Sequence, residues 1–404
     1  MSYLSRLNEI LANSRLTESF QQRFVKMVSC DYGYLIFESK KSVSIMNENI
    51  ESIYSGGLGR TVSMKWLSRR IINLCGEKHS TGGRFAREDV DLLEREIAGM
   101  PVTQVRVIRG VSGAIFSGES QPIKLGRFTL YDKSQHSELI IGDRNYDLNE
   151  TFAGESMHKV LAECTVAAAE PRKIKELAAL EFQWLESILA FMIGNRDYEF
   201  GIVNIPAARQ SLIYTVSGDS FGVSVEYNGK VNDVPLTNEL FVNPCAPFCR
   251  LMQLTEENAN SLERKLMRSV EWVAQSLREP STASAFVKAA IALEALFKTD
   301  EKSPFTPSLV AQLAEGCAQV LGTSVEECLK ISKEIRELYG IRSKIVHSGS
   351  ISASLIDLNR LISYSRSVIM ALLSDPKYLG LESPRELNMM LLKMKYTCSP
   401  SLPH

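Results

Sequence analysis

The last third of the sequence carries one helical segment after another, and this succession constrains the fold more than any other feature. Five segments place apolar residues three and four positions apart, which is the spacing of an amphipathic helix. They cover residues 257–279, 282–298, 307–321, 324–347 and 353–375. In the fourth, Ser324 is followed three residues later by Glu327, which predicts a capping box at its start. We therefore predict an all-helical domain over residues 256–376, followed by a C-terminal helix and tail over 377–404.

The first part of the chain has a different pattern, in which short alternating segments are separated by glycine, serine and aspartate clusters. Strand-like segments cover residues 32–39, 102–110, 126–132 and 137–143. Helical segments cover residues 1–25, 63–75 and 87–97. This mixture predicts an α+β N-terminal domain over residues 1–165, for which we expect a sensing or regulatory role.

Residues 166–255 are predicted to link the two parts and to complete the N-terminal region. Pro171 indicates a helix start, because the missing N–H of proline costs nothing at the first helical position. Strand-like pieces follow at residues 211–218, 221–229 and 239–244, and residues 243–250, with two prolines, have the composition of a boundary loop. The predicted fold class is α+β, with a mixed N-terminal region followed by an all-α helical bundle.

The charge balance limits the classes of protein to which the chain can belong. Lysine and arginine total 46, aspartate and glutamate total 47, and the formal net charge is -1. A protein that coats nucleic acid is normally strongly basic, so that class is disfavoured. An enzyme that acts on nucleic acid through a local basic patch is compatible with the same balance.

The cysteines and the apolar stretches bear on location and cofactors. The eight cysteines are scattered, unlike the disulfide framework of a short secreted protein. Cys245 and Cys249 form a close pair, but no second pair with zinc-site spacing accompanies them, so we expect neither a metal nor another cofactor. The N-terminus lacks the apolar core of a signal peptide, and no stretch approaches 18 uncharged apolar residues. We therefore expect a cytoplasmic protein with no membrane partner.

Arg342 is unusual because it lies on the apolar face of the fourth helical segment. It follows Leu338 by four residues and precedes Ile345 by three, and Ile335 and Val346 belong to the same predicted inward face. Arginine is not normally placed in an apolar stripe. An inward arginine needs an anionic partner, because an unpaired buried charge is very costly.

Glu294 is the candidate partner, because it lies in the segment AAIALEALF, which is otherwise free of charge. An isolated carboxylate in such a segment must be protonated or find a cation. We therefore predict that the second and fourth helices pack together and that Glu294 meets Arg342. The pair would fix the guanidinium and leave its remaining donors pointing outward.

His347 follows the arginine by five positions and precedes Gly349 and Ser350, where the helix is predicted to end. An ideal helix separates the two side chains by about 140°, but at a fraying end the histidine can turn toward the arginine. Histidine transfers protons near neutral pH, and arginine holds phosphate through paired hydrogen bonds. Together they form a minimal set for cleaving RNA, whose own 2′-hydroxyl is the nucleophile.

The spacing of arginine and histidine is weak evidence by itself, because chance alone produces it in a chain of this length. The alternative interpretation is a structural Glu–Arg pair with a histidine at a helix end. The context favours a site, since it combines an inward arginine, a glutamate in an apolar partner helix and a glycine after the histidine.

The segments AFVKAAIALEALF and LYGIRSKIVHSGS resemble the HEPN superfamily of helical ribonucleases, in particular its ApeA-like branch from bacterial anti-phage abortive-infection systems. The resemblance covers residues 256–376, and PIKLGRFTLYD in the N-terminal part resembles ApeA-like proteins more weakly. The family hallmark is an arginine followed after four to six residues by a histidine, matched here by Arg342 and His347. The position after the arginine, often Asn, Asp or His in the family, is Ser343.

The resemblance implies a metal-independent endoribonuclease that leaves a 2′,3′-cyclic phosphate and a 5′-hydroxyl. It also implies a homodimer through the helical domain, with the two motifs facing each other. Under this interpretation Arg342 binds and polarises the scissile phosphate, His347 is the general acid and base, Glu294 orients Arg342, and Ser343 assists.

Further partners follow from the same interpretation. Lys344 and Arg336, on the same helix, are expected to contact the RNA. A toxic nuclease needs restraint, so we expect the N-terminal region to recognise a phage-derived trigger or to hold the nuclease inactive. Two alternatives stay open: a catalytically inactive HEPN-like scaffold for dimerisation or binding, and a toxin subunit controlled by a separate antitoxin.

Overall fold

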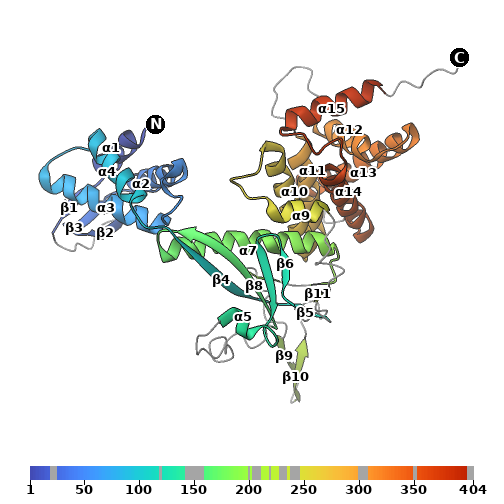
Figure 1. Cartoon of the computed structure of the whole chain (residues 1–404), viewed down its shortest axis with the longest axis horizontal. Helices are drawn as coiled ribbons and strands as arrows, with labels where there is room; N and C mark the ends of the chain where they lie inside the picture. The colour runs from blue at the N-terminus through green and yellow to red at the C-terminus, as the bar shows by residue number, and fades with distance from the viewer. Residues whose placement is uncertain are drawn as a thin grey trace. The chain divides into compact units, whose positions relative to one another are not determined.

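The computed structural model describes most of the chain and divides it into two compact units. The described residues are 1–18, 25–117, 121–141, 159–198, 201–202, 211–217, 220–226, 234–236, 246–298, 308–348 and 353–397. The first unit comprises Met1–Val107 and Thr165–Leu180, and the second comprises Ile108–Cys164 and Glu181–His404. The predicted α+β class is confirmed, since a mixed region is followed by helices (Figure 1). None of the helices in the described ranges combines the length and apolar character needed to cross a membrane.

The first unit packs helices against a three-stranded antiparallel sheet with the order β1-β3-β2. Its elements are α1 (Tyr3–Ala12), β1 (Arg15–Thr17), β2 (Lys26–Cys30), β3 (Gly33–Phe37), α2 (Lys40–Ile53), the π-helical turn η1 (Tyr54–Leu58), α3 (Met64–Thr81) and α4 (Arg87–Ala98). Ser2, Ser39 and Ser63 cap α1, α2 and α3, because each side chain accepts a hydrogen bond from a backbone N–H of the first turn. Gly82, with a φ of 66°, ends α3 in the left-handed conformation that glycine adopts at little cost.

A four-stranded sheet with the order β4-β8-β7-β6 follows along the chain, in which β7 is antiparallel to both β6 and β8 (Figure 1). The elements of this region are β4 (Thr103–Val111), β5 (Ala114–Phe116), β6 (Ile123–Leu125), β7 (Phe128–Asp132), α5 (Ser137–Ile141), β8 (Val160–Ala168), α7 (Pro171–Ile193), β9 (Ser211–Ser217), β10 (Ser220–Glu226), β11 (Val234–Leu236) and α9 (Ala246–Gln253). Strand β5 pairs in parallel with β11, and β9 pairs with β10 as an antiparallel hairpin. Helix α7 begins at Pro171, as predicted.

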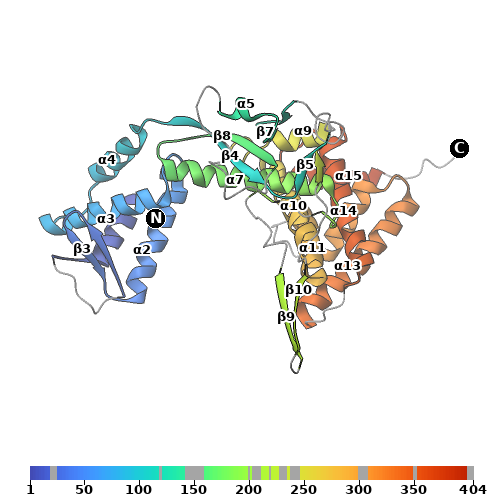
Figure 2. The ribbon, with the colours of Figure 1, turned by 90° about the horizontal axis from the view of Figure 1, so that it is seen from below.

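The C-terminal helices form a bundle around α11. They are α10 (Ser261–Arg278), α11 (Thr282–Phe297), α12 (Leu309–Leu321), α13 (Val325–Ser348), α14 (Leu355–Ser374) and α15 (Pro384–Thr397). Helix α11 lies against α10, α12, α13 and α14, which explains why its sequence is apolar on nearly every side (Figure 2). The five helices predicted for residues 256–376 are therefore confirmed.

Small residues bring α10, α11 and α14 close together. Buried serine hydroxyls of α10 donate to backbone carbonyls of α11, Ser269 to Ala292 at 2.6 Å and Ser276 to Ala285 at 2.7 Å. The Ser365 hydroxyl of α14 is shared between the carbonyls of Ala289 on α11, at 3.2 Å, and Leu361 in its own helix, at 2.9 Å. Because a buried hydroxyl is costly without a partner, these bonds fix how the three helices pack.

Several local predictions were wrong. The first helix ends at Ala12, because the chain turns into β1 at Arg15 rather than continuing to residue 25. Residues 137–141 of the predicted strand 137–143 form helix α5, since a short apolar run does not distinguish the two structures. The predicted boundary loop 243–250 contains the start of α9 at Ala246. Residues 239–245 and 142–143, on which parts of these predictions fall, lie outside the described residues.

The start of α13 differs from the predicted capping box. Ser324 Oγ accepts a hydrogen bond from the N–H of Glu327 at 3.2 Å, as the pattern requires. The Glu327 carboxylate, however, accepts from the N–H and the hydroxyl of Thr323, at 2.9 and 2.5 Å, rather than from the N–H of Ser324. These hydrogen bonds also lower the pKa of Glu327 below its usual range.

Candidate functional site

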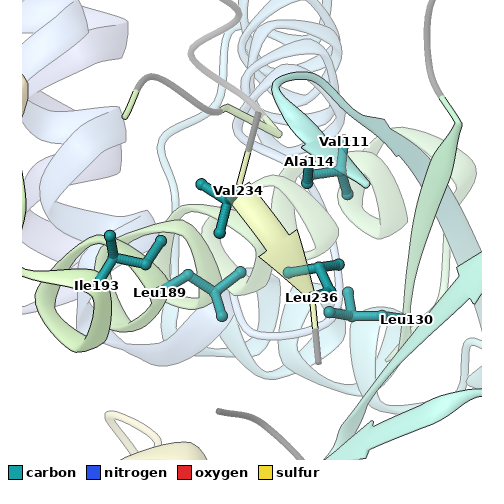
Figure 3. Close-up of a pocket in the computed structure, with 7 residues that line it drawn as sticks. All are labelled: Val111, Ala114, Leu130, Leu189, Ile193, Val234 and Leu236. Atoms are coloured by element: carbon teal, nitrogen blue, oxygen red, sulfur yellow. The ribbon is translucent and has the colours of Figure 1, made fainter. Parts of the chain in front are cut away.

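The pocket in Figure 3 does not have the chemistry of a catalytic site. It lies in the second unit among the end of β4, β5, β7, β11 and α7, and its lining side chains are all apolar (Figure 3). They are Val111, Ala114, Leu130, Leu189, Ile193, Val234 and Leu236. A binding site for a polar substrate needs convergent polar groups, and in the helical bundle such groups meet around Glu294.

Glu294 and Arg342 meet between α11 and α13, as predicted. Nη2 of Arg342 lies 3.2 Å from Oε1 of Glu294, and the two side chains are 20% and 15% exposed, respectively. Ile335 and Leu338 on the same side of α13 are buried, which is why the arginine is carried inward. Val346 is 47% exposed, so its predicted burial with the inward face was wrong. Its direction around the helix is only about 20° from that of buried Ile335, so its exposure reflects its place in the last turn of α13 rather than a different face.

Tyr339 is a further member of this site that the sequence reasoning did not single out. Its hydroxyl donates to Oε1 of Glu294 at 2.9 Å, and its ring lies 5.4 Å from the guanidinium carbon of Arg342. Burial, with the hydrogen bond to Glu294 as a smaller cause, raises the pKa of Tyr339 to about 12. We call Glu294, Tyr339 and Arg342 the Glu294 cluster. Its place beside Arg342 follows from the sequence, because residues three apart on a helix are neighbours, whereas its hydrogen bond to Glu294 on another helix does not.

One donor of Arg342 is left over. Its Nε is buried and has no hydrogen-bond partner among the described residues. A buried donor without a partner costs about 1–3 kcal/mol. The carboxylate therefore contacts the guanidinium at Nη2 and leaves Nε unsatisfied.

His347 is not brought to this cluster within the chain. Helix α13 stays helical through Ser348, and His347 is exposed. Five helical residues place it about 140° around the helix from Arg342. Between the described atoms, no hydrogen bond or ring contact joins His347 to Arg342 or Glu294. The expected turn of the histidine toward the arginine is thus not present, while Gly349 and Ser350 lie outside the described residues.

The other predicted residues share the histidine's side of α13. Ser343 precedes His347 by one turn, Lys344 by three residues and Arg336 by about three turns, so all four face the same way. Arg336, Lys344 and His347 are exposed, and Ser343 is half-buried. We call these four residues the outward face of α13. The structure therefore separates the predicted residues into an inward pair, Glu294 and Arg342, and this outward face.

Neither a metal-binding group among the described residues nor a similar known protein identifies the function of this site. In the part of the chain that the structure describes, no group of three or more His, Cys, Asp or Glu residues is placed to hold a metal ion. Cys249 of the predicted close pair is exposed, and Cys245 lies outside the described residues. Comparison of the chain with models of protein families, with curated proteins and with solved structures found no match.

Proposed function

We propose that the helical region is a HEPN-type endoribonuclease that cleaves RNA without a metal ion, as a toxin-like effector in anti-phage defence. The observation that carries the proposal is the inward Arg342, held by Glu294 at 3.2 Å with its Nε unpaired among the described residues. A structural ion pair would satisfy the guanidinium more completely. The resemblance of residues 256–376 to the HEPN superfamily supplies the reaction class.

The mechanism uses groups that the chain supplies. Arg342 binds a non-bridging oxygen of the scissile phosphate and stabilises its growing negative charge. The 2′-hydroxyl of the RNA attacks the phosphorus, losing its proton to the imidazole of His347, while the bond to the 5′-oxygen breaks. His347 moves the proton, giving it to the leaving 5′-oxygen. The products are a 2′,3′-cyclic phosphate and a 5′-hydroxyl, and Ser343 assists as a hydrogen-bonding group beside the histidine.

A second copy of the chain would complete the site. Arg342 and His347 point to different sides of α13, so one chain does not supply both groups to one phosphate. Helix α13 has 24 residues, and the apolar side chains of Val325 and Leu329 lie exposed one turn apart near its start, with Val346 exposed near its end. Exposed apolar side chains on a long helix are compatible with a contact surface. We therefore propose a homodimer in which the Arg342 of one copy works with the His347 of the other.

The N-terminal region would decide when the nuclease acts. We propose that it recognises a phage-derived trigger or restrains the helical domain, in a cytoplasmic protein. A separate antitoxin is the other source of restraint. Purification of the chain from its native operon tests this, because an antitoxin would copurify with it.

The direct test is RNA cleavage in EDTA by the wild type, Arg342→Ala and His347→Ala. We expect cleavage by the wild type and a loss of about 1000-fold or more in each variant, since each removes a group that acts in the transition state. Both variants should also abolish toxicity in cells. Equal cleavage by all three proteins would show that the mechanism is wrong.

Mixing the two variants tests whether the site is shared. A heterodimer of Arg342→Ala with His347→Ala has one site in which both residues are intact, if each site takes its arginine from one copy and its histidine from the other. We therefore expect each heterodimer to have about half of the specific activity of a wild-type dimer. The activity of the mixture should rise in proportion to its fraction of heterodimers. A mixture as inactive as the separate variants would place both groups in the same chain.

The second candidate is a scaffold that dimerises or binds a partner without cleaving RNA. The separation of Arg342 and His347 favours it, because that separation leaves the histidine without a catalytic neighbour in its own chain. The two candidates differ in their response to His347→Ala. Only the ribonuclease loses function, whereas a scaffold keeps its dimer and its partner.

A further inference from the structure

Tyr339 belongs to the Glu294 cluster, but the proposed function gives it no role. It makes two contacts there, one through the hydroxyl to Oε1 of Glu294 and one through the ring to the guanidinium of Arg342. It comes one turn before Arg342 on α13, so the same helix presents both side chains to Glu294. Tyr339 is only half-buried, and burial of apolar surface alone does not explain the placement of its hydroxyl.

The two contacts to Glu294 fall on the same oxygen. Tyr339 donates to Oε1 at 2.9 Å, and Arg342 Nη2 lies 3.2 Å from it. A carboxylate and a guanidinium often form a bidentate pair, with two parallel N–H···O bonds. Here the pair uses one oxygen, and the Nε that a second bond would use is buried without a partner among the described residues. The hydroxyl of Tyr339, which binds the same oxygen as Arg342, is therefore the group that can prevent Glu294 and Arg342 from forming a bidentate pair.

We propose that Tyr339 is a positioning residue, which holds Glu294 to a single-oxygen contact with Arg342 and so keeps part of the guanidinium available for a phosphate oxygen. The functional consequence rests on the proposed ribonuclease activity, whereas the hydrogen-bonding geometry does not. The raised pKa of Tyr339, about 12, keeps the hydroxyl protonated, so it stays a donor over the whole working range of pH. Without this donor, Glu294 would turn to place its second oxygen against Nε.

The helical region offers a matched control in a second group of the same residue types. Glu334 on α13 accepts on Oε2 from the hydroxyl of Tyr364 at 2.5 Å and from Nη2 of Arg360 at 3.0 Å, both from α14. We call these three residues the Glu334 cluster. Arg360 also has a second carboxylate, Asp357, with Oδ1 at 3.6 Å from Nη1. Loss of the Tyr364 hydroxyl thus removes the same chemical group from a place outside the proposed site.

The first arm of the test is kinetic and uses the full chain with an RNA substrate. We expect Tyr339→Phe to raise KM about tenfold and to leave kcat within about twofold, because ground-state and transition-state binding of the phosphate weaken alike. A merely structural defect would reduce the active fraction and so lower kcat at constant KM. Tyr364→Phe should change neither. An unchanged KM in Tyr339→Phe, in an enzyme that Arg342→Ala inactivates, would overturn the role of Tyr339 and leave the ribonuclease proposal intact.

Glu294→Gln in the Tyr339→Phe background sharpens this arm. The neutral amide has one oxygen and no charge, so it cannot form the bidentate ion pair that the phenylalanine variant allows. The double variant should therefore recover at least half of the tenfold loss. A double variant with the KM of Tyr339→Phe, or a higher one, would contradict the proposed cause.

The second arm needs no activity and consists of crystal structures of the wild type and Tyr339→Phe without RNA. In the phenylalanine variant we expect both Glu294 oxygens to contact Arg342, on Nε and Nη2, at about 2.8 Å. A single-oxygen contact that persists without the hydroxyl would overturn the inference. Equal RNA cleavage by the wild type and Arg342→Ala would instead remove the ribonuclease proposal, and this arm would still decide the role of Tyr339.

Discussion

The Glu294 cluster and the Glu334 cluster have the same composition but differ in how completely their arginines are satisfied. In each cluster, one glutamate oxygen accepts a hydrogen bond from a tyrosine hydroxyl and also contacts an arginine. The tyrosine and the arginine come from the same helix, which packs against the helix of the glutamate. Arg360 is 38% exposed and has a second carboxylate, Asp357, nearby, so its other donors are open to solvent. Arg342 is 20% exposed, and its Nε is buried without a partner among the described residues.

This difference indicates that the two clusters have different roles. In the Glu334 cluster the hydrogen bond from Tyr364 is the largest cause that lowers the pKa of Glu334, and the contact with that carboxylate raises the pKa of Arg360. Such mutual stabilisation is expected of a structural contact that holds α13 against α14. The Glu294 cluster retains an unsatisfied donor, a cost that structural pairing alone would remove.

The largest difference is expected from exchanging each arginine for lysine. Arg342→Lys keeps the charge but loses the planar fork that binds a phosphate oxygen through paired donors, so RNA cleavage should fall about 100-fold or more. Arg360→Lys should leave cleavage within about twofold. The measurement is kcat/KM on one RNA for both variants. Similar losses in the two variants would abolish the distinction between the clusters.

The free energy of unfolding should also respond more strongly to changes in the Glu294 cluster than in the Glu334 cluster. Glu294→Ala leaves a mostly buried guanidinium without its carboxylate and should lower the free energy of unfolding by about 2 kcal/mol, below the full cost of breaking a deeply buried pair because both groups keep some exposure. Glu334→Ala should cost about 1 kcal/mol, since Arg360 is more exposed and keeps Asp357. The urea midpoints of the two variants test this. If Glu334→Ala lowered the free energy of unfolding more than Glu294→Ala, the expected order of the two clusters would be wrong.

The sequence predicted the contact between Glu294 and Arg342 because both residues interrupt apolar helical faces, and burial forces such charges to pair. It predicted the helices of residues 256–376 for the same reason, since a periodicity repeated over many residues leaves few alternatives. Short segments failed: residues 137–141 are apolar enough for either a strand or a helix, and only their neighbours decide.

Tyr339 and His347 mark the limit of the same reasoning. The partner of the Tyr339 hydroxyl is on another helix, so periodicity along α13 does not reveal it. The direction of His347 depends on whether the last turn of α13 stays helical, and the glycine after Ser348 does not decide that. Residues whose role depends on tertiary contacts, or on the last turn of a helix, need the structure.

The pH dependence of the Glu334 cluster gives a smaller effect. The folded-state pKa of Glu334 lies below its usual range, so its ionised form stabilises the fold above the unfolded-state pKa, and this contribution is lost as the pH falls through the lower folded value. Glu334→Gln should cost about 1 kcal/mol at pH 7, and the difference from the wild type should shrink as the pH falls below about 4.3. Urea midpoints at a series of pH values measure it. A difference that stays constant down to pH 3 would show that the charge of Glu334 is not what stabilises the contact.

The smallest effect is expected on the outward face of α13. Arg336 and Lys344 are exposed there on the same side of the helix as His347, and under the proposed function they contact RNA phosphates rather than the scissile group. Arg336→Ala and Lys344→Ala should each raise KM about threefold at moderate salt and leave kcat unchanged. Each should also make log KM about 0.7 less steep in log salt concentration, because one phosphate contact to a single strand is lost. Lys377→Ala, which removes an exposed lysine paired with Asp375 just after the end of α14, is the control and should change neither quantity. If Lys377→Ala changed KM and its salt dependence as much as the other two variants, the RNA would be attracted by the overall charge of the protein. Arg336 and Lys344 would then not be specific RNA contacts, and only Arg342 and His347 would distinguish the inward cluster from the outward face.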